Sequence, residues 1–165
     1  MMNRFPSKPL TEQQALSRLS ALCARGEHSC GELADKMRRW GLPREAQERV
    51  IAWLVDKRFV DDERYARAFI ADKITYNAWG RHKIEQGLRA KQVSSSVYGP
   101  LLDDVSDDEY LRVLRPLLRA KWPAIKGGTP YECSMKLIRF AMGRGFSVDL
   151  VRRAIADLDL PLSAP

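Results

Sequence analysis

Residues that could bind a metal ion or act as nucleophiles are few in this chain of 165 residues. Cys23, His28 and Cys30 lie close together, but a closed zinc site needs four ligands at short recurrent spacings. The only other histidine is the distant His82, and neither histidine stands beside a Ser or Cys in a recognisable catalytic setting. No glycine-rich loop leads into Lys and Ser or Thr, as a phosphate-binding loop would. We therefore expect no enzyme, no metal, no cofactor and no small-molecule substrate.

Two acidic clusters could be considered as divalent metal sites or as paired acid and base. They are Asp61-Asp62-Glu63 and Asp107-Asp108-Glu109, and each precedes an amphipathic segment. Acidic side chains in the first turn of a helix are stabilised by the helix dipole and by free amide donors. We therefore expect both clusters to cap helices.

Basic residues point more clearly towards a binding function. Between Lys73 and Lys91 there are five Lys or Arg residues against one acid, Glu85. A positive ridge along the molecule would suit a phosphate backbone or the acidic groove of a protein filament, and a merely solvated face is the alternative. The candidate partner-binding or DNA-binding residues are Arg38, Arg39, Arg64, Arg81, Lys83, Arg89, Lys91, Lys136, Arg139 and Arg144.

Two aromatic residues, Tyr76 and Trp79, flank the start of the most basic segment. They could stack on exposed nucleobases, or they could fill a junction between helices. Tyr65 and Phe69 lie one helical turn apart and are most simply core contacts.

The overall charge agrees with an anionic partner. The chain carries 28 Lys and Arg against 21 Asp and Glu, a net charge of +7, and its pI is about 9.5. Three cysteines are an odd number in a chain too large to need disulfides, so we expect reduced thiols. The N-terminus lacks the apolar stretch of a signal peptide, and the longest strongly apolar run is 50–55. We expect a cytoplasmic protein that does not enter membranes.

The elements that position these residues are indicated by an apolar pattern that occurs three times. Six apolar residues are separated by four, five, four, four and four positions in each copy. The copies are Leu33, Met37, Leu42, Ala46, Val50 and Leu54; Ile84, Leu88, Val93, Val97, Leu101 and Val105; and Leu137, Ala141, Phe146, Leu150, Ala154 and Leu158. A step of four stays on one helical face, whereas a step of five indicates a turn between two helices. Each copy is therefore predicted to be a helix pair.

A third helix is predicted upstream of each pair, from apolar residues that begin at Leu16, Tyr65 and Tyr110. Four capping boxes would mark helix starts, in which Ser or Thr and a Glu or Gln three residues later satisfy each other's backbone donors. They are Thr11 with Gln14, Ser29 with Glu32, Ser106 with Glu109, and Thr129 with Glu132.

The fold predicted from these signals is all-α, with three tandem three-helix repeats in an elongated, curved array packed at right angles. The expected repeats are 11–58, 59–105 and 106–158, with a flexible N-terminus at 1–10 and a C-terminal tail at 159–165. The third repeat has a longer loop after its first helix, around Trp122 and Gly128. Because one three-helix unit buries little, neighbouring units should share apolar faces.

The sequence also resembles a known family. The run 59–66, Phe-Val-Asp-Asp-Glu-Arg-Tyr-Ala, is followed by Phe69-Ile70, by Gly80-Arg81 with Lys83-Ile84, and by Leu88 and Lys91. This pattern, together with 136–146, resembles the RecX family of recombinase modulators. Two positions depart from it: Gly87 stands where the family usually has Glu, and Gln92 where it usually has Gly.

The resemblance implies binding to the filament that a RecA-type recombinase forms on DNA, and inhibition of its ATPase, strand-exchange and co-protease activities. Weak, sequence-independent contact with DNA would accompany this. The alternative is a direct DNA-binding helical module that acts without a recombinase partner. The segment 95–104, in the position of a recognition helix, is short of Arg, Asn and Gln, which argues against reading of base sequence.

Overall fold

The described part of the chain, residues 8–160 of a computed structural model, consists of helices and contains no strand. The elements are α1 (Glu12–Arg25), α2 (Cys30–Arg39), α3 (Arg44–Asp56), α4 (Asp62–Asn77), α5 (Arg81–Ala90), α6 (Ser95–Asp103), α7 (Asp107–Lys121), the short 3-10 helix η1 (Trp122–Ala124), α8 (Pro130–Gly143) and α9 (Val148–Leu158). The all-helical fold class predicted from the apolar spacing is confirmed.

Capping residues start the helices where the sequence indicates. Thr11 and Gln14 close a full capping box on α1, and Ser106 and Glu109 close one on α7. Asp61 caps α4 by accepting a hydrogen bond from the backbone of Arg64. These contacts satisfy amide groups that would otherwise lack a partner in the first turn.

The other two expected capping boxes are only half formed. Ser29 and Thr129 accept from the backbone three residues later, as predicted. The Glu32 carboxylate instead faces His28 at 3.5 Å, and the Glu132 carboxylate accepts from the backbone of Gly128 at 2.9 Å. In both cases a nearby donor competes for the glutamate.

The turn between the second and third helix of each unit adopts a left-handed conformation at one residue. The φ angles are +82° at Gly41, +59° at Gln92 and +95° at Gly145. Glycine adopts this region without penalty, whereas other residues pay about 1–2 kcal/mol. Gln92 therefore accepts strain at the position where its two counterparts are glycine.

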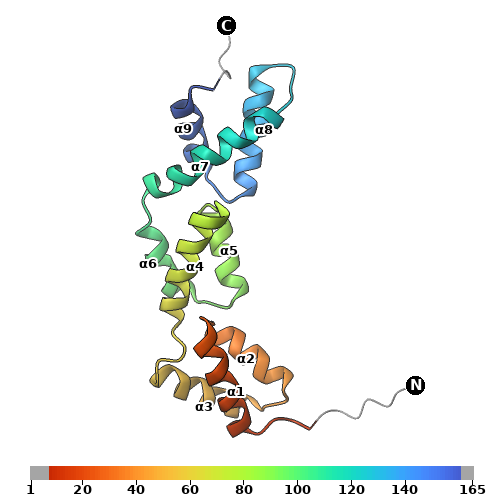
Figure 1. Cartoon of the computed structure of the whole chain (residues 1–165), viewed down its shortest axis with the longest axis vertical. Helices are drawn as coiled ribbons and strands as arrows, with labels where there is room; N and C mark the ends of the chain where they lie inside the picture. The colour runs from red at the N-terminus through yellow and green to blue at the C-terminus, as the bar shows by residue number, and fades with distance from the viewer. Residues whose placement is uncertain (1–7, 161–165) are drawn as a thin grey trace, which may run out of the picture.

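The helices form an elongated array of three-helix units, as predicted (Figure 1). We call them the first unit (α1–α3), the second unit (α4–α6) and the third unit (α7–α9). In each unit the first and third helices pack against each other and the third packs against the middle helix, and in the second and third units the first helix packs against the middle helix as well. The expected repeat limits of 11–58, 59–105 and 106–158 remain a prediction, and residues 1–7 and 161–165 of the expected flexible ends lie outside the described residues.

The apolar core is divided unevenly. The second and third units share one cluster of buried residues, which includes Ile84, Leu111 and Leu137. The first unit has a separate cluster around Leu19, Leu33 and Leu54. The expectation that all neighbouring units share apolar faces is therefore wrong for the first and second units, because polar groups make much of their contact.

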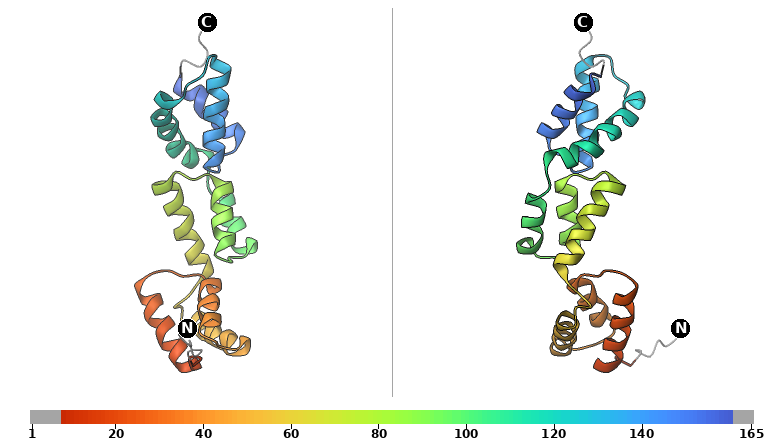
Figure 2. Two further views of the ribbon diagram at one scale, coloured as in Figure 1. Left: turned by 90° about the vertical axis from the view of Figure 1, so that its right-hand side faces the viewer. Right: turned by 60° about the vertical axis from the view of Figure 1, so that its left-hand side comes forward.

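The middle helices α2, α5 and α8 are stacked end to end along the array (Figure 2). Between the third and second units, the backbone N–H of Gly80 donates to the carbonyl of Arg144 at 2.8 Å, and that of His82 donates to Gly145 at 3.1 Å. A Cβ atom on Gly80 would lie 2.4 Å from the backbone of Gly145. This junction is therefore a close backbone-to-backbone contact that requires glycine.

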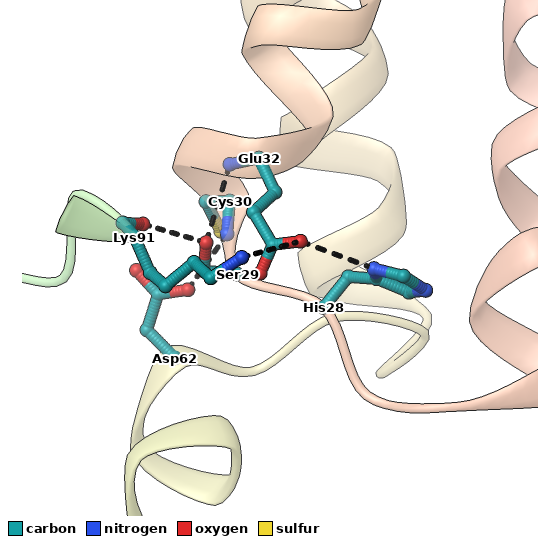
Figure 3. Close-up of polar contacts among 6 residues, drawn as sticks. All are labelled: His28, Ser29, Cys30, Glu32, Asp62 and Lys91. Carbon is teal, nitrogen blue, oxygen red and sulfur yellow. Dashed lines mark hydrogen bonds and ion pairs between the residues drawn. The ribbon is translucent and has the colours of Figure 1, made fainter. Parts of the chain in front are cut away.

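The junction between the second and first units uses the same helix ends but is made largely by side chains (Figure 3). The buried Ser29 hydroxyl donates to the carbonyl of Lys91 at 2.7 Å. The backbone of Cys30 donates to the Asp62 carboxylate at 2.8 Å, so this acidic residue links two units in addition to lying in the first turn of α4. Gln92 adds a hydrogen bond of 2.7 Å to Asp35.

Candidate functional site

The predicted basic residues divide into two groups, according to whether carboxylates neutralise them. Arg81 belongs to the neutralised group: its guanidinium lies 2.7 Å from Asp103 and 3.0 Å from Glu85. The hydrogen bond to Asp103, and to a lesser extent the one to Glu85, raises the pKa of Arg81 above its ordinary value. This arginine joins α5 to α6, which is a structural task.

Four more predicted residues also have acidic partners. Arg38 pairs with Asp35, Arg89 lies 3.7 Å from Glu85, and Lys91 lies 3.9 Å from Glu32. Arg64 lies 2.7 Å from Glu27 and also donates to the carbonyls of Arg58 and Phe59. Much of the ridge predicted from the sequence is thus locally balanced in charge.

Lys83 and Arg144 are held differently, on the faces of aromatic rings. The Lys83 ammonium lies 4.7 Å from the centre of the Trp79 ring, and the Arg144 guanidinium lies 5.7 Å from that of Phe140. Arg144 also donates to the carbonyl of Asn77 at 3.1 Å. Aromatic faces attract cations without cancelling their charge.

Two further lysines complete this arrangement. The Lys73 ammonium lies 4.8 Å from the Trp79 ring and 5.3 Å from the Phe69 ring, and Lys121 lies 4.9 Å from the Phe140 ring. Within residues 8–160, none of the four cations forms an ion pair with a carboxylate. We call this set the cation–aromatic strip: Lys73, Lys83, Lys121 and Arg144 on Phe69, Trp79 and Phe140.

The strip is built at the junction between the second and third units. Trp79 follows the end of α4, where Ala78 takes a left-handed conformation, and packs edge-on against Phe69. A Cβ atom on Gly87 would lie 2.7 Å from the tip of the Phe69 ring. The glycine at 87, which departs from the family pattern, therefore leaves room for the aromatic floor of the strip.

An exposed aromatic side chain lies on the last helical turn of α4 beside the strip. Tyr76 is 81% exposed and stands three residues after Lys73. Trp79, the other aromatic candidate, is partly buried and packs in the junction, as its alternative interpretation predicts. Unneutralised cations beside an open aromatic ring can contact phosphates or carboxylates and can stack on a base.

The remaining predicted residues lie outside the strip. Arg39 and Arg139 are exposed on α2 and α8, and Lys136 donates to the carbonyl of Lys126 in the loop before α8. All ten predicted residues therefore lie at described positions, but only Lys83 and Arg144 belong to the strip.

Sequence reasoning did not select Lys73 or Lys121 as binding residues. The spacing of Lys73 from Phe69, four residues on one helix, was an available signal. Lys121 and Phe140 come from different helices, and only the packing of α7 with α8 brings them together.

The described residues offer little support for a metal site or for a reactive thiol. No group of three or more His, Cys, Asp and Glu side chains there is placed to hold a metal ion. The three cysteines are free thiols, and burial raises the pKa of Cys30 to about 12, with a further contribution from Asp62. Residues 8–160 contain no helix with the length and hydropathy needed to cross a membrane.

The fold is an all-helical repeat, and the strip is a surface suited to binding a partner rather than to catalysing a reaction. Family models match two parts of the chain: residues 61–98 match the second three-helix domain of RecX, and residues 107–155 match the third. The regulatory protein RecX of Chlorobium limicola is 33% identical over 131 residues, which cover 79% of this chain and 80% of that protein. This chain belongs to the RecX family of regulatory proteins, which is not a family of enzymes.

Other relatives and a solved structure agree. The regulatory protein RecX of Vibrio campbellii is 26% identical over 156 residues, 94% of this chain and 97% of that protein. That of Clostridium perfringens is 29% identical over 128 residues, and this chain covers 59% of its length. The crystal structure of RecX from Lactobacillus salivarius has a TM-score of 0.83 at 17% identity and covers 90% of this chain and 96% of that one. This likeness shows the shared fold.

Proposed function

We propose that this chain binds the filament that a RecA-type recombinase forms on DNA and inhibits its ATPase, strand-exchange and co-protease activities. Such a regulator would act in homologous recombination, DNA repair and the SOS response. Membership of the RecX family supports the proposal, and the cation–aromatic strip is the observation of this molecule that carries it.

The strip suits an anionic filament for a physical reason. A cation already paired with a carboxylate must exchange one anion for another, so it gains little from a phosphate. The four strip cations have no such internal partner among residues 8–160. They can therefore meet phosphates or acidic side chains without first breaking an ion pair.

The length of the array adds a second support. Several units of one chain can touch successive subunits of a filament, so that each contact raises the effective concentration of the next. The exposed Arg39 in the first unit and Arg139 in the third lie outside the strip and could take part in such distributed contacts.

The proposal is tested by adding the whole protein to a bacterial RecA-type recombinase turning over ATP on single-stranded DNA. We expect turnover to fall as the protein is titrated at moderate salt. Unchanged turnover over a wide concentration range would contradict the proposed function.

The alternative is a direct DNA-binding module, and the exposed Tyr76 beside Lys73 is the observation that favours it. A titration on DNA without recombinase separates the two functions. The proposed regulator should bind DNA weakly, without sequence preference and with strong dependence on salt. Tight, sequence-selective binding would favour the alternative.

A further inference from the structure

A cavity of about 720 Å³ lies between the second and third units. Its apolar lining includes Leu102, Phe146 and Leu150, and Met142, which is 46% exposed, stands at its edge. The volume is sufficient for one or two side chains of a partner, and the apolar lining would favour hydrophobic ones. The cation–aromatic strip makes no use of this cavity.

A tyrosine whose buried hydroxyl has no partner is among the residues that line the cavity. The Tyr110 side chain packs edge-on against Phe146 and is only 4% exposed. Its hydroxyl has no hydrogen-bond partner among the described residues. Burial raises the pKa of Tyr110 to about 12, so the hydroxyl keeps its proton at neutral pH and can donate. A buried donor without an acceptor is unfavourable, and because this hydroxyl is covered in the free protein, an occupant reaches it with an acceptor only when the Tyr110 side chain or the atoms over it shift.

The charged residues that line the cavity are three carboxylates, Glu85, Asp107 and Asp149, and two arginines, Arg81 and Arg153, with His82 beside them. Arg81 is neutralised by Asp103 and Glu85, and Arg153 lies 3.9 Å from Asp107. Asp149 also lines the cavity and has no ion-pair partner within residues 8–160. The one carboxylate in excess, Asp149, favours a basic side chain over a phosphate at this edge of the cavity.

The cavity and the strip lie on different sides of α5. Glu85 lines the cavity, whereas Lys83 lies on Trp79. Two residues along a helix are separated by about 200° around its axis. One face of the molecule therefore presents free cations, and another presents an apolar cavity with an acidic edge.

We infer that this cavity receives an apolar side chain of a protein partner whose neighbouring residue is Lys or Arg. A backbone carbonyl of that segment accepts the hydrogen bond from Tyr110, and the basic residue faces Asp149. The inference rests on the proposed function, because the partner is taken to be the recombinase. It adds that the recombinase contacts this cavity.

Two substitutions test the cavity through the affinity of the whole protein for recombinase filaments on single-stranded DNA. Tyr110→Phe removes only the hydroxyl, so the stability of the free protein should stay equal or rise while affinity falls about threefold to tenfold. Asp149→Asn should weaken binding about threefold. Glu45→Gln is the matched control, because Glu45 is the second residue of α3 as Asp149 is of α9, and its affinity should not change.

A photo-crosslink identifies the occupant. Met142→p-benzoylphenylalanine, irradiated with the filament, should give an adduct to a recombinase peptide in which an apolar residue adjoins Lys or Arg. An adduct only with DNA or with a second copy of this chain would overturn the inference, as would unchanged affinity of Tyr110→Phe. Recombinase ATP turnover is measured on the same samples, so inhibition without the adduct refutes the cavity alone, and absent inhibition refutes the proposed function.

Discussion

The two junctions of the array join equivalent helix ends by different means. Between the second and third units, Gly80 meets Gly145 through backbone contacts, and one apolar core runs across. Between the first and second units, Ser29 and Asp62 make side-chain hydrogen bonds, and the apolar cores are separate. Apolar burial stabilises more than exchange of hydrogen bonds with water does. We infer that the second and third units fold as one body, to which the first is joined less strongly.

This difference also places the two candidate binding regions. The strip and the cavity both lie at the junction between the second and third units. Binding residues from different helices keep their geometry best where the elements that carry them cannot move apart. The junction between the second and third units is therefore the one that holds the candidate binding residues in place.

Among the substitutions that test this comparison, Gly80→Ala is expected to lower the stability of the protein most. The added Cβ would lie 2.4 Å from the backbone of Gly145 and 2.5 Å from that of Phe146, which cannot shift without separating the units. The free energy of unfolding should fall by about 3 kcal/mol, measured by urea denaturation. Gly143→Ala is the control, because its Cβ meets nothing within 4 Å, it is the last residue of α8, and the change should alter stability by about 1 kcal/mol or less. Similar unfolding curves for the two variants would contradict the comparison.

A smaller loss of stability, which a second substitution should largely restore, is expected from Gly31→Ala at the other junction. Its Cβ would lie 2.4 Å from the Cβ of Gln92 and 3.0 Å from the carbonyl of Lys91. We expect a loss of about 2 kcal/mol in unfolding free energy. Adding Gln92→Gly should recover most of it, since that removes the clashing Cβ and suits the left-handed φ of +59°. A double-mutant cycle with no coupling would show that the two residues do not meet.

The smallest effect is expected from Ser29→Ala. It removes both the cap on α2 and the hydrogen bond to Lys91, for a loss of about 1–2 kcal/mol. Hydrogen exchange should rise at the start of α2 and stay unchanged in α8. Ser147→Ala removes only a cap, that of α9, and should cost about 1 kcal/mol or less. Equal losses in the two variants would mean that the Ser29 contact with Lys91 adds nothing.

Much of the fold could be predicted from the sequence because helical periodicity is a local property. The step of five at Met37 to Leu42 correctly indicates a turn, and Thr11 and Ser106 correctly mark helix starts. The half-formed box at Ser29 was predictable only in part, because the contact of Glu32 with His28 is local but Lys91, which also faces Glu32, belongs to another unit. That competition depends on how the units stack.

The candidate site was predictable only in part, for the same reason. Arg81 and Lys83 are two residues apart and look equally suitable in the sequence. Packing of α6 gives Arg81 the Asp103 carboxylate, whereas Lys83 lies on an aromatic ring. Sequence identifies which residues are charged, but the neutralising partners come from the tertiary structure.

The measurement that tests the central claim most directly compares two doubly substituted proteins in the recombinase ATPase assay. Lys73→Gln with Lys83→Gln removes two free cations, and Arg38→Gln with Arg89→Gln removes two that are paired with carboxylates. Both variants lose the same net charge, and circular dichroism checks that both fold. The concentration for half-inhibition should rise about tenfold for the first pair and less than about twofold for the second. An equal rise for both pairs, or a larger one for the arginines, would contradict the account.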